Sequence, residues 1–368
     1  MPISLSADDH GILPDRMIAA LVASGVVIPA AAPDGDQIQP ASIDLRLGEI
    51  AYRVRASFLP GPGVTVAERI DELKLHEFPL TDGAVLETGC VYIVPLMESL
   101  ALPHNLAAVA NPKSSTGRLD VFTRVIADRT RGFDRIDAGY RGPLYAEISP
   151  RTFPVLVREG SRLSQMRFRC GRPVVTGAAL EALHRRERLV DDEAPDLSLG
   201  VPLGVDLVGF GAERLIGYRA KRHTGVIDVD RRASYEVVDF WEPIRGRRAG
   251  SLVLDPGEFY ILASKEAVQV PPDHAAEMVP FDALVGEFRV HYAGFFDPGF
   301  GHAGAGGRGA RAVLEVRSRE VPFIIEHGQT VGRLVYERML ARPDTVYGHG
   351  IGSNYQAQGL KLSKHFRG

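Results

Sequence analysis

The densest group of polar residues set among apolar ones lies between positions 111 and 147. It opens with the run NPKSSTGR, in which Lys113 and Arg118 supply two cations and Ser114, Ser115 and Thr116 supply three hydroxyls. Lys and Arg neutralise phosphate charge, and hydroxyls and turn amides bind the remaining phosphate oxygens. Residues 111–147 carry seven Lys+Arg and five Asp+Glu, within a chain of net charge −3. The run is a candidate phosphate-binding turn, although composition alone favours a polar turn that caps a helix.

A carboxylate follows at position 147. The turn Arg135–Gly142 leads into a predicted strand, Leu144–Ile148, in which Glu147 has apolar neighbours. A carboxylate in such a place either pairs with a structural partner or serves as a general acid or base. Most single buried glutamates are structural, so the residue alone leaves both interpretations open.

The elements that must position these residues form an internal repeat. Short apolar runs rich in Val, Ile, Phe and Tyr, with 39 Gly and 25 Pro, indicate many short strands in a barrel or sandwich. Three segments recur at an offset of 168 residues: Leu86–Val94 as Leu254–Leu262, Tyr145–Glu147 as Val313–Glu315, and Pro154–Gly160 as Pro322–Gly328. We predict a duplicated β domain, with one copy at 1–172, a charged, helix-like linker at 173–195, and the second copy at 196–368.

The two copies differ where chemistry is expected. Opposite Lys113–Arg118 the second copy has Pro280–Gly286, which contains no Lys, Arg, Ser or Thr. If the cation-and-hydroxyl turn served only the fold, both copies would need it. Glu315, in contrast, persists at the position equivalent to Glu147, which indicates that a Glu at this place also suits a structural role.

Composition narrows the class of protein. The chain has 368 residues, of which 45% are hydrophobic and 24% charged, as in a soluble protein of two or three domains. A nearly balanced charge argues against bulk binding to nucleic acid. The uncharged stretch Met17–Pro33 is too short to span a membrane, and Met1–Gly11 lacks the basic region of a signal peptide. We therefore expect a cytoplasmic protein that binds neither a membrane nor nucleic acid.

Metal-ligand spacing is missing from the sequence. Cys90 and Cys170 are too far apart for the Pro-Cys-x-x-Cys pattern of zinc deaminases, and the histidines follow no ligand pattern. We expect no metal site built from protein ligands.

Taken together, the runs QPASIDLRLG (39–48), KSSTGRL (113–119) and RIDAGYRG (135–142), followed by Glu147, resemble the dCTP deaminases, a family in the trimeric dUTPase superfamily. The resemblance covers the whole first half and is weaker in the second, whose tail Tyr347–Leu360 resembles the segment that closes the family's active site. It implies a mostly β fold, with two tandem dUTPase-like distorted jelly-roll barrels and a few short helices. It also implies a homo-oligomer, with a trimer as one arrangement, and sites at subunit boundaries.

The same resemblance implies hydrolysis of dCTP to dUTP and ammonia, with Mg²⁺ accompanying the triphosphate and no zinc. Glu147 matches the catalytic acid/base, aided by a water that Arg118 or Ser114 holds. The expected substrate contacts are Lys113, Ser114, Ser115 and Arg118 for the phosphates and the water, Asp137 for the deoxyribose, Tyr145 beside the base, and Tyr347 and Gln358 from the tail. Because the tail follows the second half, we expect the two halves to meet at the site, within one chain or between chains.

Several positions depart from the family pattern. Lys113 stands where Arg is usual, Asn354 where Lys is expected, and Asp128 where His is common. Six extra residues, Arg129–Asp134, follow Asp128. The run RIDAGYRG is as close to dUTPases as to deaminases, so a dUTPase or a bifunctional deaminase and diphosphatase is an alternative. A non-catalytic nucleotide-binding regulator is the alternative from another class.

Overall fold

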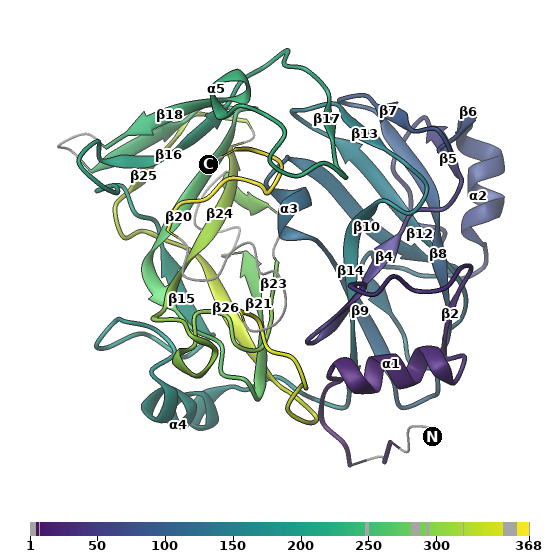
Figure 1. The fold of residues 1–368 in the computed structure, drawn as a ribbon, viewed down its shortest axis with the longest axis horizontal. Helices are drawn as coiled ribbons and strands as arrows, with labels where there is room; N and C mark the ends of the chain where they lie inside the picture. The colour runs from purple at the N-terminus through teal and green to yellow at the C-terminus, as the bar shows by residue number, and fades with distance from the viewer. Residues whose placement is uncertain are drawn as a thin grey trace. The chain divides into compact units, whose positions relative to one another are not determined.

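The computed structural model describes residues 5–6, 8–246, 250–280, 288–291, 294–318, 320–348 and 359–367 (Figure 1). The chain forms two compact units. The first contains residues 1–173, 225–234 and 339–344, and the second contains residues 174–224, 235–338 and 345–368. The segments 225–234 and 339–344 belong to the first unit, although the repeat in the sequence assigns them to the second barrel.

The first unit consists mainly of two antiparallel sheets and a smaller third one. The first sheet has the order β11 (Arg135–Ile136), β9 (Ala107–Pro112), β14 (Arg162–Cys170), β4 (Ser42–Arg46), β3 (Ile38–Gln39), with β1 (Gly11–Ile12) beside β14. The second has the order β10 (Val121–Ala127), β12 (Arg141–Pro150), β8 (Val91–Ala101), β5 (Ile50–Val54), β6 (Lys74–Pro79), with β2 (Val27–Pro29) beside β8. The third is β17 (Ile227–Asp228), β13 (Val155–Val157), β7 (Ala84–Leu86).

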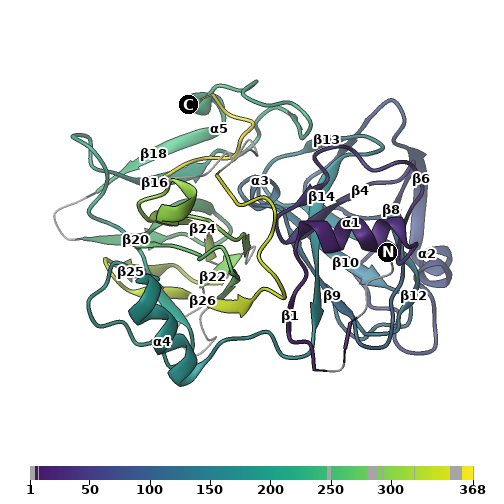
Figure 2. The ribbon, with the colours of Figure 1, turned by 60° about the horizontal axis from the view of Figure 1, so that its bottom comes forward.

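Three short helices accompany these sheets. They are α1 (Asp15–Ala23), α2 (Val66–Leu73) and α3 (Ser114–Gly117). Helix α1 buries Ile18 and Leu21 and lies near β4 (Figure 2). Helix α2 begins with a capping box, in which the Thr65 side chain accepts from the Glu68 backbone and the Glu68 side chain accepts from the Thr65 backbone. It packs beside β5 (Figure 1).

Both faces of β12 are buried, which decides the environment of Glu147. Leu144, Ala146 and Ile148 lie on one face of this strand, and Tyr145 and Glu147 lie on the other, because successive strand side chains alternate. On β10 the hydroxyl of Thr123, which shares the face of Ile148, lies 3.4 Å from the hydroxyl of Ser164 on β14. The first face therefore meets the other large sheet. The second face is covered by a small apolar core that includes α2.

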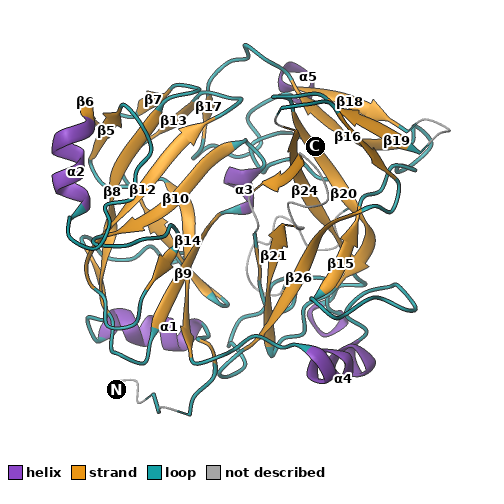
Figure 3. Cartoon of the chain, turned by 180° about the vertical axis from the view of Figure 1, so that it is seen from behind, coloured by secondary structure: helices purple, strands orange, loops and turns teal. Residues whose placement is uncertain are grey.

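The second unit is built in the same way. Its sheets have the orders β15 (Val201–Gly204), β26 (Thr330–Arg338), β21 (His274–Pro280), β23 (Phe295–Phe296); β18 (Trp241–Arg245), β16 (Leu215–Ala220), β20 (Phe259–Val268), β24 (Ala310–Ser318), β22 (Phe288–His291); and β19 (Ser251–Leu254), β25 (Phe323–Glu326). The described part of this unit also contains the α-helices α4 (Gly177–Glu187) and α5 (Val237–Phe240) and the 3-10 helix η2 (Ala303–Ala305). The mostly β fold with few short helices is thus confirmed (Figure 3).

The repeat seen in the sequence returns in strand register. Glu147 pairs with Ile93 between β12 and β8, and Glu315 pairs with Ile261 between β24 and β20. Leu86 pairs with Val155, and Leu254 pairs with Phe323. Each second pair lies 168 residues after the first, so equal sequence spacing reflects equal strand pairing. No helix among the described residues has the length and apolar character needed to cross a membrane.

Candidate active site

Glu147 lies in a row of side chains that crosses four strands of the second sheet. Backbone register places Tyr52 of β5 beside Ile93 of β8, Ile93 beside Glu147 of β12, and Glu147 beside Arg124 of β10. Cross-strand neighbours on one face of a sheet are within side-chain contact distance. The row therefore gives this carboxylate an apolar neighbour on one side and a cation on the other.

The two carboxylate oxygens of Glu147 differ in their hydrogen bonds. Oε1 accepts hydrogen bonds from Nη2 of Arg124 at 2.6 Å and from Nε of the same side chain at 3.2 Å. Oε2 is buried and has no hydrogen-bond partner among the described residues, and the whole residue is 1% exposed. Leaving a buried acceptor unsatisfied costs about 1–3 kcal/mol, and more for a charged one. Oε2 is therefore an oxygen that a bound water or ligand would stabilise.

Tyr145 shares this face but is a core residue. It packs with Val54, Val66, Ile70, Ile93 and Ile126, and Phe133 lies against the same cluster. Burial raises the pKa of its hydroxyl, and the nearby Asp128 carboxylate raises it further. The predicted contact with the base remains a prediction, while the structure gives this ring a packing role beside Glu147.

The cation-and-hydroxyl run forms the short helix α3 and its flanks. The backbone amide of Lys113 donates to the carbonyl of Leu163 at 2.9 Å, which fixes the run to the first sheet. The amide of Arg118 donates to the carbonyl of Ser114 at 3.1 Å and closes the turn. Ser115 and Arg118 are buried, and Ser114 is half-buried. The predicted polar turn thus exists as one tight, well-packed element.

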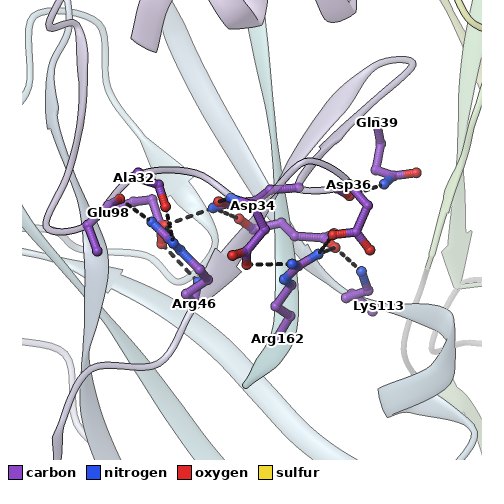
Figure 4. Close-up of polar contacts among 11 residues, drawn as sticks. Ala32, Asp34, Asp36, Gln39, Arg46, Glu98, Lys113 and Arg162 are labelled. Atoms are coloured by element: carbon purple, nitrogen blue, oxygen red, sulfur yellow. Dashed lines mark hydrogen bonds and ion pairs between the residues drawn. The ribbon is translucent and has the colours of Figure 1, made fainter. Parts of the chain in front are cut away.

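Lys113 already has an acidic partner. Its ammonium forms an ion pair with the carboxylate of Asp44 on β4, which is 1% exposed (Figure 4). Arg162 of β14 lies 3.6 Å from the same carboxylate, 2.5 Å from Asp34 and 2.8 Å from Asp36. Burial raises the pKa of Asp36, but the hydrogen bond and charge of Arg162 outweigh it and lower that pKa overall. Two cations therefore face three carboxylates, and a triphosphate would have to compete with Asp44 for Lys113.

A second ion pair, next to this cluster, serves the fold. Nε of Arg46 donates to Glu98 at 2.8 Å, and both side chains are buried. The other guanidinium nitrogens of Arg46 donate to the carbonyls of Ala31 and Ala32 (Figure 4). Since these contacts satisfy both charges, Arg46 ties β4 to the preceding loop and to β8.

The predicted site residues fall into separate places. The side chain of Lys113 contacts the first sheet, whereas Glu147 contacts Arg124 on the face of the second sheet that is turned away from the first. Asp137 is exposed in the turn after β11. Tyr347, in the second unit, donates its amide to the carbonyl of Pro298 and packs 5.8 Å from the ring of Phe300. Gln358 and Asn354 lie outside the described residues.

Arg124 is the residue beside Glu147 that sequence reasoning passed over. It appears there only as one of seven cations between positions 111 and 147. The register of β10 against β12 places it directly opposite Glu147. In the part of the chain that the structure describes, no group of three or more His, Cys, Asp or Glu side chains has the arrangement of a metal site.

Comparison with known families decides the classification. Residues 9–172 match the model of the 2'-deoxycytidine 5'-triphosphate deaminase N-terminal domain, and residues 176–366 match that of its C-terminal domain. The chain belongs to the dCTP deaminase family. The resemblance inferred from the motifs is confirmed.

Similar proteins include one solved structure and several curated dCTP deaminases. The crystal structure of the 2'-deoxycytidine 5'-triphosphate deaminase from Agrobacterium tumefaciens is 62% identical and has a TM-score of 0.87, covering 91% of this chain and all of that one. A dCTP deaminase of Halorubrum lacusprofundi is 32% identical over 160 residues, 43% of this chain and 76% of the relative. A protein of Halobacterium salinarum described as "dCTP deaminase, dUMP-forming" is 32% identical over 161 residues, 43% of this chain and 79% of the relative. Each of these two alignments therefore covers less than half of this dCTP deaminase family member.

Proposed function

We propose that this chain deaminates dCTP by hydrolysis, forming dUTP and ammonia, with Glu147 as the acid/base and without zinc. Mg²⁺ enters as part of the substrate, bound to the triphosphate. The observation that carries the proposal is Oε2 of Glu147, which is buried and has no hydrogen-bond partner in the described part of the chain, beside an Oε1 that accepts two hydrogen bonds from Arg124. Such an arrangement leaves one oxygen available to exchange a proton with a water.

The proposed reaction moves protons through one carboxylate. Oε2 accepts a proton from water as the water oxygen forms a bond to C4 of cytosine, and Glu147 passes that proton to N3. The C4 hydroxyl of the resulting intermediate then loses its proton, which Glu147 delivers to the leaving amino group. The bond between C4 and the amino nitrogen breaks, a carbonyl remains at C4, and ammonia departs. A positioned acid/base of this kind accelerates a reaction by about 10²–10⁴-fold.

The triphosphate requires a second set of residues. We assign this part to Lys113, Arg118 and the hydroxyls of Ser114 and Ser115, with Asp137 for the deoxyribose. Because the Lys113 contact is on the first sheet and the Glu147 contact is on the outer face of the second, we infer that neighbouring chains supply the two parts of each complete site. This supports a homo-oligomer, for which three chains are one arrangement.

The repeat provides a matched experiment. Glu147→Gln keeps the shape of the side chain but removes its ability to accept the proton, so deamination should fall by about 10²-fold or more while dCTP binding persists. Glu315→Gln makes the same change at the equivalent buried position of the second half and should leave turnover near that of the unmodified protein. Ammonia release and calorimetric dCTP binding measure the two effects. Normal turnover by the Glu147 variant would show that another group is the base.

A second activity is favoured by one observation, the dUMP-forming description of the Halobacterium salinarum relative. Incubation with dCTP and Mg²⁺ followed by measurement of dUTP, dUMP and pyrophosphate separates the possibilities. Pyrophosphate with dUMP indicates a bifunctional enzyme, and pyrophosphate from dUTP without ammonia from dCTP indicates a dUTPase. Binding of dCTP without any product indicates a nucleotide-binding regulator.

A further inference from the structure

We propose that Arg124 is a positioning residue for Glu147, and that the loop Arg129–Asp134 provides the aromatic surface that holds Arg124 in place. This inference rests on the proposed function of Glu147. The experiment below distinguishes a failure of the role proposed for Arg124 from a failure of the role proposed for Glu147.

The first step is the asymmetry of the ion pair. Arginine and a carboxylate commonly meet fork to fork, with one nitrogen on each oxygen. Here Nη2 and Nε of Arg124 both donate to Oε1 of Glu147, at 2.6 and 3.2 Å. The cation therefore fixes one oxygen and stabilises the charged carboxylate, while Oε2 receives no hydrogen bond from any residue that the structure describes. An Arg that only neutralised a buried Glu would gain more by covering both oxygens.

The second step is what holds Arg124. Its guanidinium carbon lies 3.4 Å from the centre of the Phe133 ring and 4.5 Å from the centre of the Phe122 ring. Nη2 also donates to the hydroxyl of Ser57 at 3.0 Å. Aromatic faces attract a cation within about 6 Å, and the attraction increases as water is excluded. The side chain is thus constrained by two rings, a hydroxyl and the carboxylate.

The third step is the support of Phe133. The Asp134 amide donates to the carbonyl of Val125 at 2.9 Å, and the Val125 amide donates to the Asp134 carboxylate at 2.7 Å. At the other end of the loop, the Arg129 amide donates to the carbonyl of Val64 at 3.2 Å. Val125 is the residue directly after Arg124, so the loop is fastened to the strand whose side chain it covers.

The fourth step is the comparison between the two copies. Glu315 is also buried, yet its register partner on the strand equivalent to β10 is His291. The residue in register with this buried Glu thus differs between the two copies: Arg124 in the first and His291 in the second. The arginine accompanies the copy that carries the cation-and-hydroxyl turn, as expected for a residue that serves the chemistry.

The test compares Arg124→Ala with Arg219→Ala in the full-length protein. Arg219 of β16 makes a contact of the same geometry with Glu242 of β18, with Nε at 3.1 Å and Nη2 at 2.5 Å from one oxygen, at a more exposed pair, so it controls for the loss of a cross-strand Arg–Glu contact. We expect Arg124→Ala to lower kcat about 10–100-fold, the scale of a misplaced catalytic group, with little change in KM. Added guanidinium ion should restore part of that kcat, and Arg124→Lys should lose less. The Arg219 variant should match the unmodified protein.

The outcomes separate this inference from the proposed function. If Glu147→Gln keeps its turnover, the acid/base role proposed for Glu147 fails, and the inference about Arg124 fails with it. If Glu147→Gln is inactive but Arg124→Ala keeps its kcat, or loses it without any rescue by guanidinium or by Lys, the positioning role is overturned. Should Arg124→Ala fail to fold, Phe133→Leu keeps the ion pair and removes only the ring. That variant should lower kcat about tenfold at unchanged KM, and an unchanged kcat would overturn the inference.

Discussion

Arg158 and Asp228 form a two-pronged ion pair within the first unit, although 70 positions separate them in the chain. Nη1 of Arg158 lies 2.8 Å from one carboxylate oxygen of Asp228, and Nη2 lies 2.9 Å from the other. Asp228 belongs to β17, which pairs in parallel with β13. The pair therefore attaches a segment from late in the sequence to the sheet of the first unit.

Asp228→Asn should destabilise this attachment. Arg158 is 34% exposed, so we expect a loss of about 1–2 kcal/mol rather than the 3–5 kcal/mol of a fully buried pair. Urea unfolding near neutral pH measures it. Asp344→Asn, which removes an exposed partner of Arg16 in the same unit, should change stability by less than about 1 kcal/mol. If the two variants lost equal free energy of unfolding, the stabilising role of the Arg158–Asp228 pair would be contradicted.

The same pair predicts a pH dependence. The hydrogen bond from Arg158 lowers the pKa of Asp228 against the opposing effect of burial. A carboxyl whose pKa is lower in the folded state stabilises the fold above its unfolded pKa of about 3.9, and this contribution is lost as the pH falls through the folded value. The stability difference between the unmodified protein and Asp228→Asn should therefore be constant above about pH 5 and shrink below about pH 4. A difference that instead grew in acid would contradict this sign.

Glu98→Gln tests the buried pair of Arg46 and Glu98. Replacing the carboxylate leaves the charge of Arg46 uncompensated in a buried place, which costs about 3–5 kcal/mol. The unfolding midpoint in urea should fall accordingly. Glu77→Gln, at an exposed pair with Lys74, is the control and should have little effect. A near-normal midpoint for Glu98→Gln would mean that Arg46 keeps its place through the carbonyls of Ala31 and Ala32 alone.

Lys113→Ala tests the proposed contact with the triphosphate. Removing a cation that binds phosphate should raise KM for dCTP about tenfold and leave kcat within about threefold, since the lost contact serves substrate and transition state alike. Lys74→Ala, a surface cation on β6, should leave KM unchanged. If KM for the Lys113 variant stayed normal, the ammonium would serve only the ion pair with Asp44.

Mixed oligomers test the sharing of sites between chains. Arg118→Ala and Glu147→Gln should each be inactive alone. If one chain supplies the phosphate contacts and its neighbour the carboxylate, co-expression at equal amounts restores both intact parts in about a quarter of the sites. Deamination by purified mixed oligomers, measured as ammonia release, should recover to that level. No recovery would show that each chain completes its own site.

Much of the architecture was predictable from local pattern. Strand-forming runs and the constant offset of 168 residues indicated a duplicated β fold, because repeated sequence repeats its alternation and its turns. The run from Lys113 to Arg118 and the apolar surroundings of Glu147 were equally visible, since composition and alternation are properties of short segments. The family followed from the same motifs.

The partners of these residues were decided only by tertiary structure. Strand register placed Arg124, rather than any of the other six cations nearby, opposite Glu147, and it set Asp44 against Lys113. Likewise, residues 225–234 joined the first unit through β17 and Arg158. Such pairings depend on which strands lie side by side and at what offset. They arise from the packing of the whole unit, and no short stretch of the chain contains that information.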